Sequence, residues 1–149
     1  MVDVVDRQTR SRMMSGIRGA NTKPEIMIRK SLHSRGVRYR LHSKGLPGKP
    51  DIILPKYRVA IFVHGCFWHC HDCHLFKWPS TREKFWKEKL SQNAARDKRN
   101  TEALLTHGWR VLVIWECSIK NKDAAAVTRI IDRAEEFITS ADSYLELSS

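Results

Sequence analysis

The segment from residue 64 to residue 74 gathers most of the chain's metal-ligating side chains. It reads His-Gly-Cys-Phe-Trp-His-Cys-His-Asp-Cys-His and holds four of the seven histidines and three of the four cysteines. Zinc takes four thiolate or imidazole ligands in a tetrahedron, and loops with ligands two to four residues apart supply them. The sequence therefore predicts a zinc site. Its spacing leaves the ligands open among six candidates: Cys66, Cys70, His71, Cys73, His74 and the distant Cys117.

Two adjacent bulky aromatic residues, Phe67 and Trp68, lie inside this segment. A turn closed by zinc cannot easily bury both rings, because adjacent side chains point to opposite sides. Two interpretations fit the pair. It packs against the rest of the fold, or it forms an apolar wedge that enters between base steps of DNA. The spacing alone does not decide between them.

A second group of polar residues lies at the ends of two short apolar runs. Asp51 follows Pro50 at the start of the first run, and His64 ends the second. If the runs pair as neighbouring strands, these two side chains come close together. A carboxylate there can hold a hard cation such as Mg²⁺, which polarises a phosphate and activates water, although a turn or strand cap also explains an isolated Pro-Asp. His69 fits a zinc ligand, a general base or neither role equally well.

Polar side chains recur at helical spacing further along the chain. Lys89, Asn93 and Asp97 are four residues apart and Trp86 lies one turn before them, so all four share one helix face. That face suits contacts with base edges or phosphates, and a solvated charged face would show the same pattern. Glu25 has a local explanation as the acid of a capping box that begins at Thr22.

The elements that position these residues follow from periodicity, capping residues and glycines. The expected elements are a helix over about 23–35, a hairpin over 51–54 and 58–63, a long charged helix over about 81–107, a buried strand over 111–115 and an amphipathic helix over 127–138. This order predicts an α/β fold with a mixed sheet covered by helices. We expect residues 140–149 to form a flexible tail.

Length and charge narrow the class of protein. A chain of 149 residues suits one domain over 1–149 with a sizeable core. The net charge is +11, and residues 123–149 hold only two of the 27 bases but six of the 16 acids, which leaves 25 bases against 10 acids on the first 122 residues. Such a balance indicates nucleic acid or another phosphate-rich partner. We expect residues 1–20, which include four arginines, to form an arm along a phosphate backbone.

The sequence has no feature of a membrane or exported protein. It contains no run near the roughly 20 apolar residues of a membrane span. Its N-terminus carries Asp3 and Asp6 where a secretory signal would carry bases. We therefore expect a cytoplasmic protein with reduced cysteines, in which clustered Cys and His residues indicate a metal site rather than disulfides.

Taken in order, these motifs resemble the very short patch repair (Vsr) endonucleases, a bacterial family of DNA mismatch endonucleases. The matching segments are Thr9-Arg10-Ser11 with Met14, Pro50-Asp51, 62–69, Cys73, Thr81-Arg82, Phe85-Trp86, Lys89, Asn93, Arg96-Asp97, Gly108-Trp109-Arg110 and Trp115-Glu116-Cys117. They span most of residues 6–120. The resemblance implies a fold related to the restriction endonucleases, with a structural zinc. It also implies an enzyme that nicks one strand of duplex DNA beside the thymine of a T:G mismatch, the product of 5-methylcytosine deamination.

The resemblance also assigns roles to single residues. It implies that Asp51 is the direct Mg²⁺ ligand together with the main-chain carbonyl of Val63. His69 would be the general base, with Asp97 as the residue that orients it. The resemblance further implies that Glu25 and His64 act through metal-bound waters or on the scissile phosphate. The implied DNA contacts are a wedge of Phe67, Trp68 and Trp86 and three residues that read the mismatch, Met14, Lys89 and Asn93.

The implied zinc ligands are Cys66, His71, Cys73 and Cys117, and an all-thiolate set with Cys70 in place of His71 is the alternative. The chain also departs from the wider restriction fold. The Glu-x-Lys motif of its second strand is absent from residues 59–63, which read Val-Ala-Ile-Phe-Val. The resemblance to the mismatch family implies that His64 and His69 replace the polar residues of that motif. The absence of the motif argues against a restriction enzyme.

The expected partner is double-stranded DNA that contains a T:G mismatch, and a MutL-type repair protein is a candidate second partner. We expect a monomer that does not bind membranes. Two rival interpretations exist. A non-catalytic zinc module would explain the charge, but not the polar residues Asp51, Glu25, His64 and His69. A His-Cys or HNH-type nuclease would require a helix directly after the hairpin, where a cysteine-rich loop stands instead.

Overall fold

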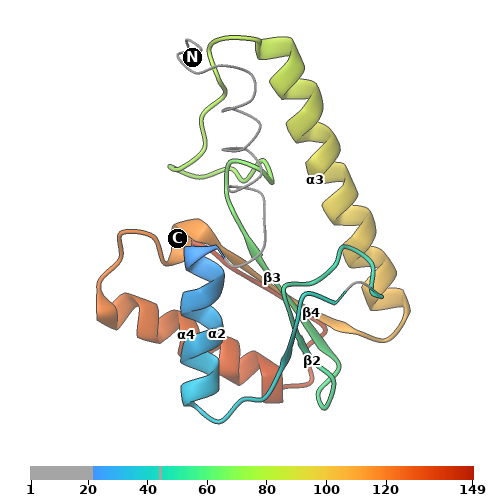
Figure 1. Cartoon of the computed structure of the whole chain (residues 1–149), viewed down its shortest axis with the longest axis vertical. Coiled ribbons are helices and arrows are strands. Elements are labelled where there is room, and N and C mark those ends of the chain that lie inside the picture. Colours follow the sequence, from blue (N-terminus) through green and yellow to red (C-terminus); the bar gives the residue numbers. More distant parts are fainter. Residues whose placement is uncertain (1–21, 44) are drawn as a thin grey trace.

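The computed structural model describes residues 22–43 and 45–149 (Figure 1). The predicted arm over residues 1–20, including Met14, lies outside the described residues. Among the described residues, no helix is long and apolar enough to cross a membrane.

A five-stranded mixed sheet forms the centre of the fold. Its strands are β1 (Arg40–Leu41), β2 (Ile52–Leu54), β3 (Val59–His64), β4 (Arg110–Trp115) and β5 (Tyr144–Leu147), and they lie side by side in this order. β1, β2 and β3 form an antiparallel meander, whereas β4 and β5 run parallel to β3. The predicted hairpin and the predicted strand over 111–115 are confirmed as β2, β3 and β4.

The prediction of a flexible tail over residues 140–149 is wrong. Residues 144–147 form β5, which pairs with β4 in the register Val111↔Tyr144 to Ile114↔Leu147. Leu147 is fully buried, and the free energy gained from that burial and from the ladder hydrogen bonds holds the segment in place. Leu147 is the one buried residue of this edge strand, so its four residues carry too weak a pattern for a prediction from sequence.

Helices cover the two faces of the sheet, as predicted. They are α2 (Lys23–Ser34), α3 (Glu83–Thr106) and α4 (Ala124–Thr139), and a short 3-10 turn, η1 (Glu116–Ser118), follows β4. Figure 1 shows α2 and α4 together on one side of the sheet and α3 on the other side. The upper half of α3 and the chain between β3 and α3 extend beyond the sheet. The molecule is therefore an α/β protein in which part of α3 and the loop before it project beyond the sheet.

Alternating residues of β3 and β4 build a separate core on each face of the sheet. On the α2 and α4 side, Ile61 and Leu112 pack with Ile28 and Phe137. On the α3 side the core is smaller, and its members are Ala60, Phe62, Cys66, Leu104, Val111, Val113, Trp115 and Cys117. Burial on both faces explains why these strands are continuous apolar runs. The second core also contains two of the predicted zinc ligands.

Candidate active site and metal centre

An open cleft of about 900 Å³ lies at the end of β3, where the sheet, α2 and α3 meet. Its lining comes from five parts of the chain. The predicted site residues in it are Glu25, Asp51, Val63, His64, Phe67, Trp68, His69, Lys89, Asn93 and Asp97. Residues up to 72 positions apart in the sequence therefore share one site.

Asp51 lies beside β3, directly before the first residue of β2. Its Oδ2 atom accepts a hydrogen bond of 2.8 Å from the Val63 backbone N–H. Burial raises the pKa of the Asp51 carboxyl to about 6, and the nearby carboxylate of Glu25 adds to the rise. The N–H of Val63 opposes this change, because it stabilises the charged form. Asp51 is therefore an ionised carboxylate at neutral pH that is poorly compensated by its surroundings.

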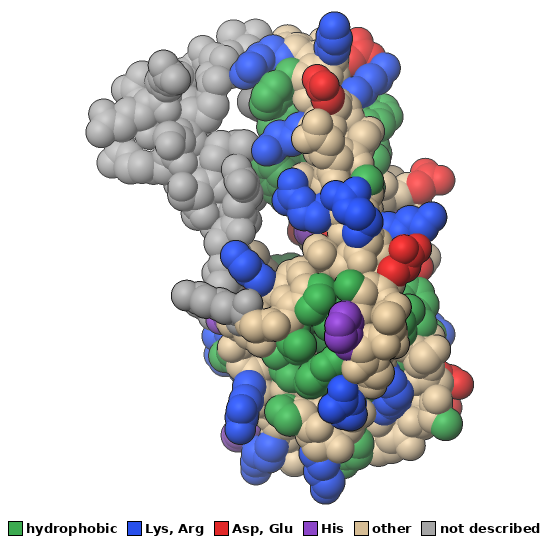
Figure 2. Space-filling model, turned by 90° about the vertical axis from the view of Figure 1, so that its right-hand side faces the viewer, with side chains coloured by type: hydrophobic (Ala, Val, Ile, Leu, Met, Phe, Trp, Pro, Cys, Tyr) green, Lys and Arg blue, Asp and Glu red, His purple; other side chains and the backbone are tan. Residues whose placement is uncertain are grey.

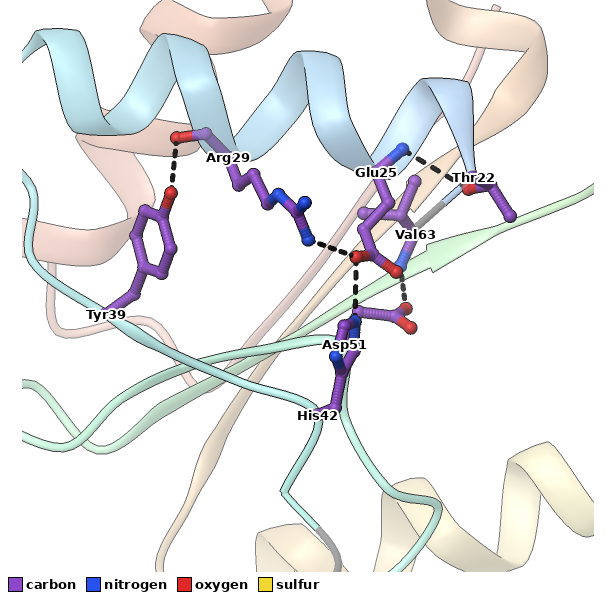
Figure 3. Close-up of polar contacts among 7 residues, drawn as sticks. All are labelled: Thr22, Glu25, Arg29, Tyr39, His42, Asp51 and Val63. Carbon is purple, nitrogen blue, oxygen red and sulfur yellow. Dashed lines mark hydrogen bonds and ion pairs between the residues drawn. The ribbon is translucent and has the colours of Figure 1, made fainter. Parts of the chain in front are cut away.

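Glu25 is the other buried acid of the cleft, with 2% of its surface exposed. The N-terminal turn of α2 carries it, because the Thr22 hydroxyl caps the helix at the Glu25 N–H as the sequence predicted. Two side chains donate to Glu25 Oε2: Arg29 Nη1 at 2.9 Å and His42 Nε2 at 2.8 Å. Figure 3 shows the Glu25 and Asp51 carboxyl groups approaching one another from α2 and from the start of β2.

The pair of acids fits a divalent cation. Two carboxylates close together in a partly buried site repel each other, and a hard cation that takes oxygen ligands would relieve this repulsion. Val63, whose main-chain carbonyl is the second implied Mg²⁺ ligand, lines the same cleft. The residues present therefore suit Mg²⁺ better than a metal that prefers sulfur or imidazole.

His69, Asp97 and His64 form a second polar group on the α3 side of the cleft. His69 Nδ1 lies 2.5 Å from Asp97 Oδ2, which fixes one nitrogen of the ring. The rings of His64 and His69 stack, with centroids 3.8 Å apart and planes 8° apart. Burial and the nearby His69 and His71 hold the pKa of His64 well below its usual value, so the His64 ring is neutral. The ligand atoms of His64, His69 and Asp97 lie within 4.8 Å of one another. However, the nitrogen lone pairs of two stacked rings lie in parallel planes and do not converge on one metal ion.

A separate cluster of sulfur and nitrogen ligands lies below the cysteine-rich loop. Its members are Cys66, His71, Cys73 and Cys117, whose ligand atoms all lie within 4.8 Å of one another. Cys66 and Cys117 are buried, and all three cysteines are free thiols. Cys70 is not in this group and takes a left-handed conformation with φ of 55°. The cluster has the donor set of a tetrahedral zinc site.

The surroundings of the cluster orient its ligands. The His71 ring stacks on Trp115 with centroids 4.0 Å apart. The backbone N–H of Cys117 donates to Cys66 Sγ, and that of Ser149 donates to Cys117 Sγ, each over 3.4 Å. Burial raises the pKa of the Cys66 thiol. Burial acts in the same direction on Cys117, but hydrogen bonds from Ser149, Cys66 and Cys73 outweigh it and lower the pKa of that thiol.

The three predicted wedge residues form one aromatic cluster. The Phe67 ring lies 5.1 Å from the Trp68 ring and 5.6 Å from the Trp86 ring, and Trp68 and Trp86 are 5.9 Å apart. All three rings are partly exposed. Edge-to-face contacts at these distances hold the rings as one unit. Two of the three rings, Phe67 and Trp68, follow the predicted zinc ligand Cys66 by one and two residues.

The polar face predicted for α3 is confirmed in part. Lys89, Asn93 and Asp97 all line the cleft. However, the Asn93 amide nitrogen donates to the Trp68 carbonyl over 3.1 Å, so this side chain also supports the aromatic loop. Lys and Arg side chains follow the exposed length of α3 (Figure 2). They are Lys84, Lys87, Lys89, Arg96, Lys98 and Arg99.

Sequence reasoning missed several residues of the cleft. Arg29 and His42 contact Glu25, and Lys49, Arg96 and Glu116 line the cleft. Arg29 stands four residues after Glu25, a spacing that could have identified it as an ion-pair partner on the same helix. Arg96 and Glu116 lie in segments that match the family, but their types and spacing gave no site role. His42 and Lys49 carry no local signal, because only the tertiary structure brings them to the site.

Known proteins resemble this chain over most of its length. The family "DNA mismatch endonuclease Vsr" matches residues 2–75. The chain is 42% identical to the DNA mismatch endonuclease Vsr of Escherichia coli K12 over 138 residues, which are 93% of this chain and 88% of that protein. It belongs to the Vsr family. A Type II nicking enzyme of Xanthomonas oryzae pv. oryzae, V.XorIIP, is 44% identical over 134 residues, which are 89% of this chain and 98% of that enzyme.

Membership of the Vsr family confirms the resemblance that the motifs indicated. The protein is accordingly a strand-nicking endonuclease. The rival interpretation as a non-catalytic zinc module is therefore wrong. The rival His-Cys or HNH interpretation fails as well, because the family is a different one.

Proposed function

We propose that this Vsr-family protein is a Mg²⁺-dependent endonuclease that nicks one strand of duplex DNA beside the thymine of a T:G mismatch. Such mismatches arise when 5-methylcytosine deaminates, and the nick would begin very short patch repair. One observation carries the proposal. A hydrogen-bonded His69–Asp97 pair faces the acids Asp51 and Glu25 across a cleft whose rim holds an aromatic cluster.

The aromatic cluster supplies a physical route to mismatch selectivity. Phe67, Trp68 and Trp86 would enter between base steps as a wedge, which costs a few kcal/mol per unstacked step. That cost is lower at a T:G pair than at a Watson–Crick pair, because the mismatch is less well paired. Lys89 and Asn93 would contact the DNA beside the wedge. Met14 would read the mismatch with them, although its position lies outside the described residues.

His69 would act as the general base. Because the Asp97 carboxylate would accept a hydrogen bond from Nδ1–H, the other ring nitrogen, Nε2, is the one that can take a proton from water. The carboxylate of Asp97 would then stabilise the charged imidazolium. The neutral ring of His64, stacked on His69, would donate to the scissile phosphate without repelling the protonated base strongly.

Asp51 and the main-chain carbonyl of Val63 would hold Mg²⁺, with Glu25 acting through water. When bound, the cation would stabilise negative charge on the phosphate and activate the water. The cluster of Cys66, His71, Cys73 and Cys117 would hold a structural Zn²⁺ that fixes the aromatic loop relative to β3 and β4. This division gives each metal a donor set of its own chemical class.

The expected setting follows from the family. The arrangement of a mixed sheet with helices on both faces is compatible with a restriction-endonuclease-like fold. We propose that the enzyme acts as a monomer on double-stranded DNA and that a MutL-type repair protein is a second partner. The basic face of α3 would contribute to the electrostatic attraction of the duplex (Figure 2).

A nicking assay tests the proposed function. Two duplexes that differ only in T:G versus C:G at one position are incubated with and without Mg²⁺. We expect nicking of the T:G duplex alone, only with Mg²⁺, and on the strand that carries the thymine. Asp51→Ala should bind the T:G duplex and fail to nick it. Equal cleavage of both duplexes, or activity without a divalent cation, would contradict the proposal.

A further inference from the structure

His42 lies outside the predicted site and contacts both acidic residues of the cleft; Figure 3 shows its contact with Glu25. Its side-chain Nε2 bonds Glu25 Oε2 over 2.8 Å. Its backbone N–H donates to the main-chain carbonyl of Asp51 over 3.0 Å. A single residue therefore links the helix that carries one acid to the strand edge that carries the other.

The ion pair of Arg29 is a contact of another kind. Arg29 stands four residues after Glu25, so its 2.9 Å ion pair joins two positions of one helix. The Arg29 backbone carbonyl also accepts a hydrogen bond of 3.1 Å from the Tyr39 hydroxyl, but this contact does not involve the Glu25 carboxylate. His42 follows β1, whose residue Leu41 pairs with Ile52 of β2. The contact from His42 to Glu25 is thus a contact between the sheet and the helix.

The backbone at His42 also has an unusual conformation. Its φ is 51°, in the left-handed region that non-glycine residues rarely adopt. Such a conformation costs free energy and persists where surrounding contacts require it. At this position the contacts that hold the conformation are the hydrogen bonds of His42 to Glu25 and to the Asp51 carbonyl. The left-handed turn directs the imidazole toward α2, while the N–H stays on the Asp51 carbonyl.

We infer that His42 is a positioning residue that sets the separation of the Glu25 and Asp51 carboxylates and thereby the divalent-cation affinity of the cleft. The inference rests on the proposed function in so far as these acids hold the catalytic cation. His42 is not among the residues that line the cleft. Its effect passes through Glu25, in the way that partners of ligating groups tune metal sites.

A matched set of substitutions separates this role from a backbone role. In His42→Gln the amide nitrogen reaches about as far as Nε2 and can still donate to Glu25. In His42→Asn the amide nitrogen falls short, yet asparagine adopts the left-handed conformation more readily than glutamine. If His42 positions Glu25, the Gln variant should bind the divalent cation more tightly than the Asn variant. If His42 has a purely conformational role, the Asn variant should bind it more tightly. His33→Ala, at an exposed histidine of α2, is the control.

The first readout is the affinity for Mn²⁺ without DNA, measured by electron paramagnetic resonance. Mn²⁺ prefers oxygen ligands and so does not report on the cysteine cluster. We expect His42→Asn and His42→Ala to weaken Mn²⁺ binding about tenfold or more. His42→Gln should recover most of the affinity, and His33→Ala should match the parent protein. Addition of His42→Ala to Glu25→Gln should cause little further loss.

The second readout is the single-turnover nicking rate on a T:G duplex, which should follow the order of the Mn²⁺ affinities. If Asn equals or exceeds Gln, or if all three variants bind Mn²⁺ as the parent does, the inference is wrong. If the parent protein fails to nick T:G duplexes but the order of Mn²⁺ affinities holds, the proposed function fails and the positioning role stands. Unfolding midpoints confirm that each variant is folded.

Discussion

The Nδ1 atom of His69 lies 2.5 Å from Oδ2 of Asp97. These residues come from the loop after β3 and from the middle of α3, and they are 28 positions apart. The contact determines which tautomer of His69 exists in the cleft. With Nδ1 bonded to a carboxylate, the proton stays on Nδ1, and Nε2 keeps the lone pair that a general base needs.

Asp97→Asn should therefore lower the rate of nicking strongly without loss of DNA binding. Asparagine can donate its amide proton to Nδ1, which would stabilise the wrong tautomer and remove the charge that supports the imidazolium. In a comparable His–Asp pair of a serine protease, this change costs about 10⁴ in rate, so we expect a loss of about 100-fold or more. Single-turnover rates and the Kd for a T:G duplex measure the two effects separately.

Glu88→Gln is the control for this prediction, because it removes another acid of α3, one that is exposed and does not line the cleft. It should leave the rate nearly unchanged. If Asp97→Asn nicks as fast as the parent enzyme, or if its entire defect lies in Kd, then Asp97 does not orient the base.

Most of the fold could be predicted because its elements carry strong local patterns. The capping box at Thr22, the apolar runs of β2, β3 and β4, and the apolar face of α4 each depend on nearby residues alone. The two strands that were missed are different. β1 has two exposed residues and β5 has only one buried residue, Leu147, so their existence depends on pairing with strands that the local sequence does not specify.

The site was predictable to the extent that its residues are close in sequence or belong to a family motif. The cysteine-rich loop showed a metal site by composition, but spacing could not choose between Cys70 and His71. In the structure, His71 joins Cys66 in the four-ligand cluster. Cys70, which stands between them in the sequence and has a left-handed backbone conformation, does not. The link from His42 to Glu25 was not predictable at all, since it depends on the register of β1 against β2.

Asp51→Asn should make the Mg²⁺-free protein more stable while abolishing nicking. The pKa of Asp51 rises from 3.8 to about 6 on folding. A raised pKa means that Asp51 favours the folded state most below pH 4 and that this contribution is lost as pH rises through 6. At neutral pH the ionised group costs at most about 3 kcal/mol, or several degrees in Tm. The Tm advantage of Asp51→Asn should therefore grow from pH 4 to pH 7.

Thermal unfolding without Mg²⁺, in buffers between pH 4 and pH 8, measures this difference. Addition of Mg²⁺ at pH 7.5 should raise the Tm of the parent protein by mass action and leave that of Asp51→Asn nearly unchanged. A Tm difference that is constant across this pH range would show that Asp51 is not the group responsible.

Cys66→Ser should lose bound zinc, whereas Cys70→Ser should retain it. Cys66 is buried within the four-ligand cluster, and Cys70 is outside the cluster. Because a structural zinc contributes directly to folding, its loss should lower the Tm markedly. Zinc content per chain, measured by atomic emission on purified variants, tests both statements. Loss of zinc from Cys70→Ser, with zinc kept in His71→Ala, would favour the all-thiolate set.

Trp68→Ala should reduce discrimination between T:G and C:G duplexes more than it reduces DNA binding in general. Trp68 contacts both Phe67 and Trp86, so its removal takes one ring from the wedge and leaves the other two supported only by their contact with each other. Base–aromatic stacking is worth about 1–3 kcal/mol per base, which predicts a loss of roughly tenfold in the ratio of the two Kd values. A 2-aminopurine placed beside the mismatch reports unstacking directly, and its fluorescence should rise with the parent enzyme and much less with the variant.

Trp78→Ala is the matched control, because Trp78 is also an exposed aromatic residue of the same loop. It contacts Phe76 at 4.9 Å and lies outside the cluster of Phe67, Trp68 and Trp86. Its loss should leave both the Kd ratio and the 2-aminopurine signal close to those of the parent enzyme. Equal losses in the two variants would indicate that aromatic area in general, rather than the three-ring wedge, binds the duplex. An unchanged ratio in Trp68→Ala would place the selectivity for T:G in groove contacts such as those of Lys89 instead.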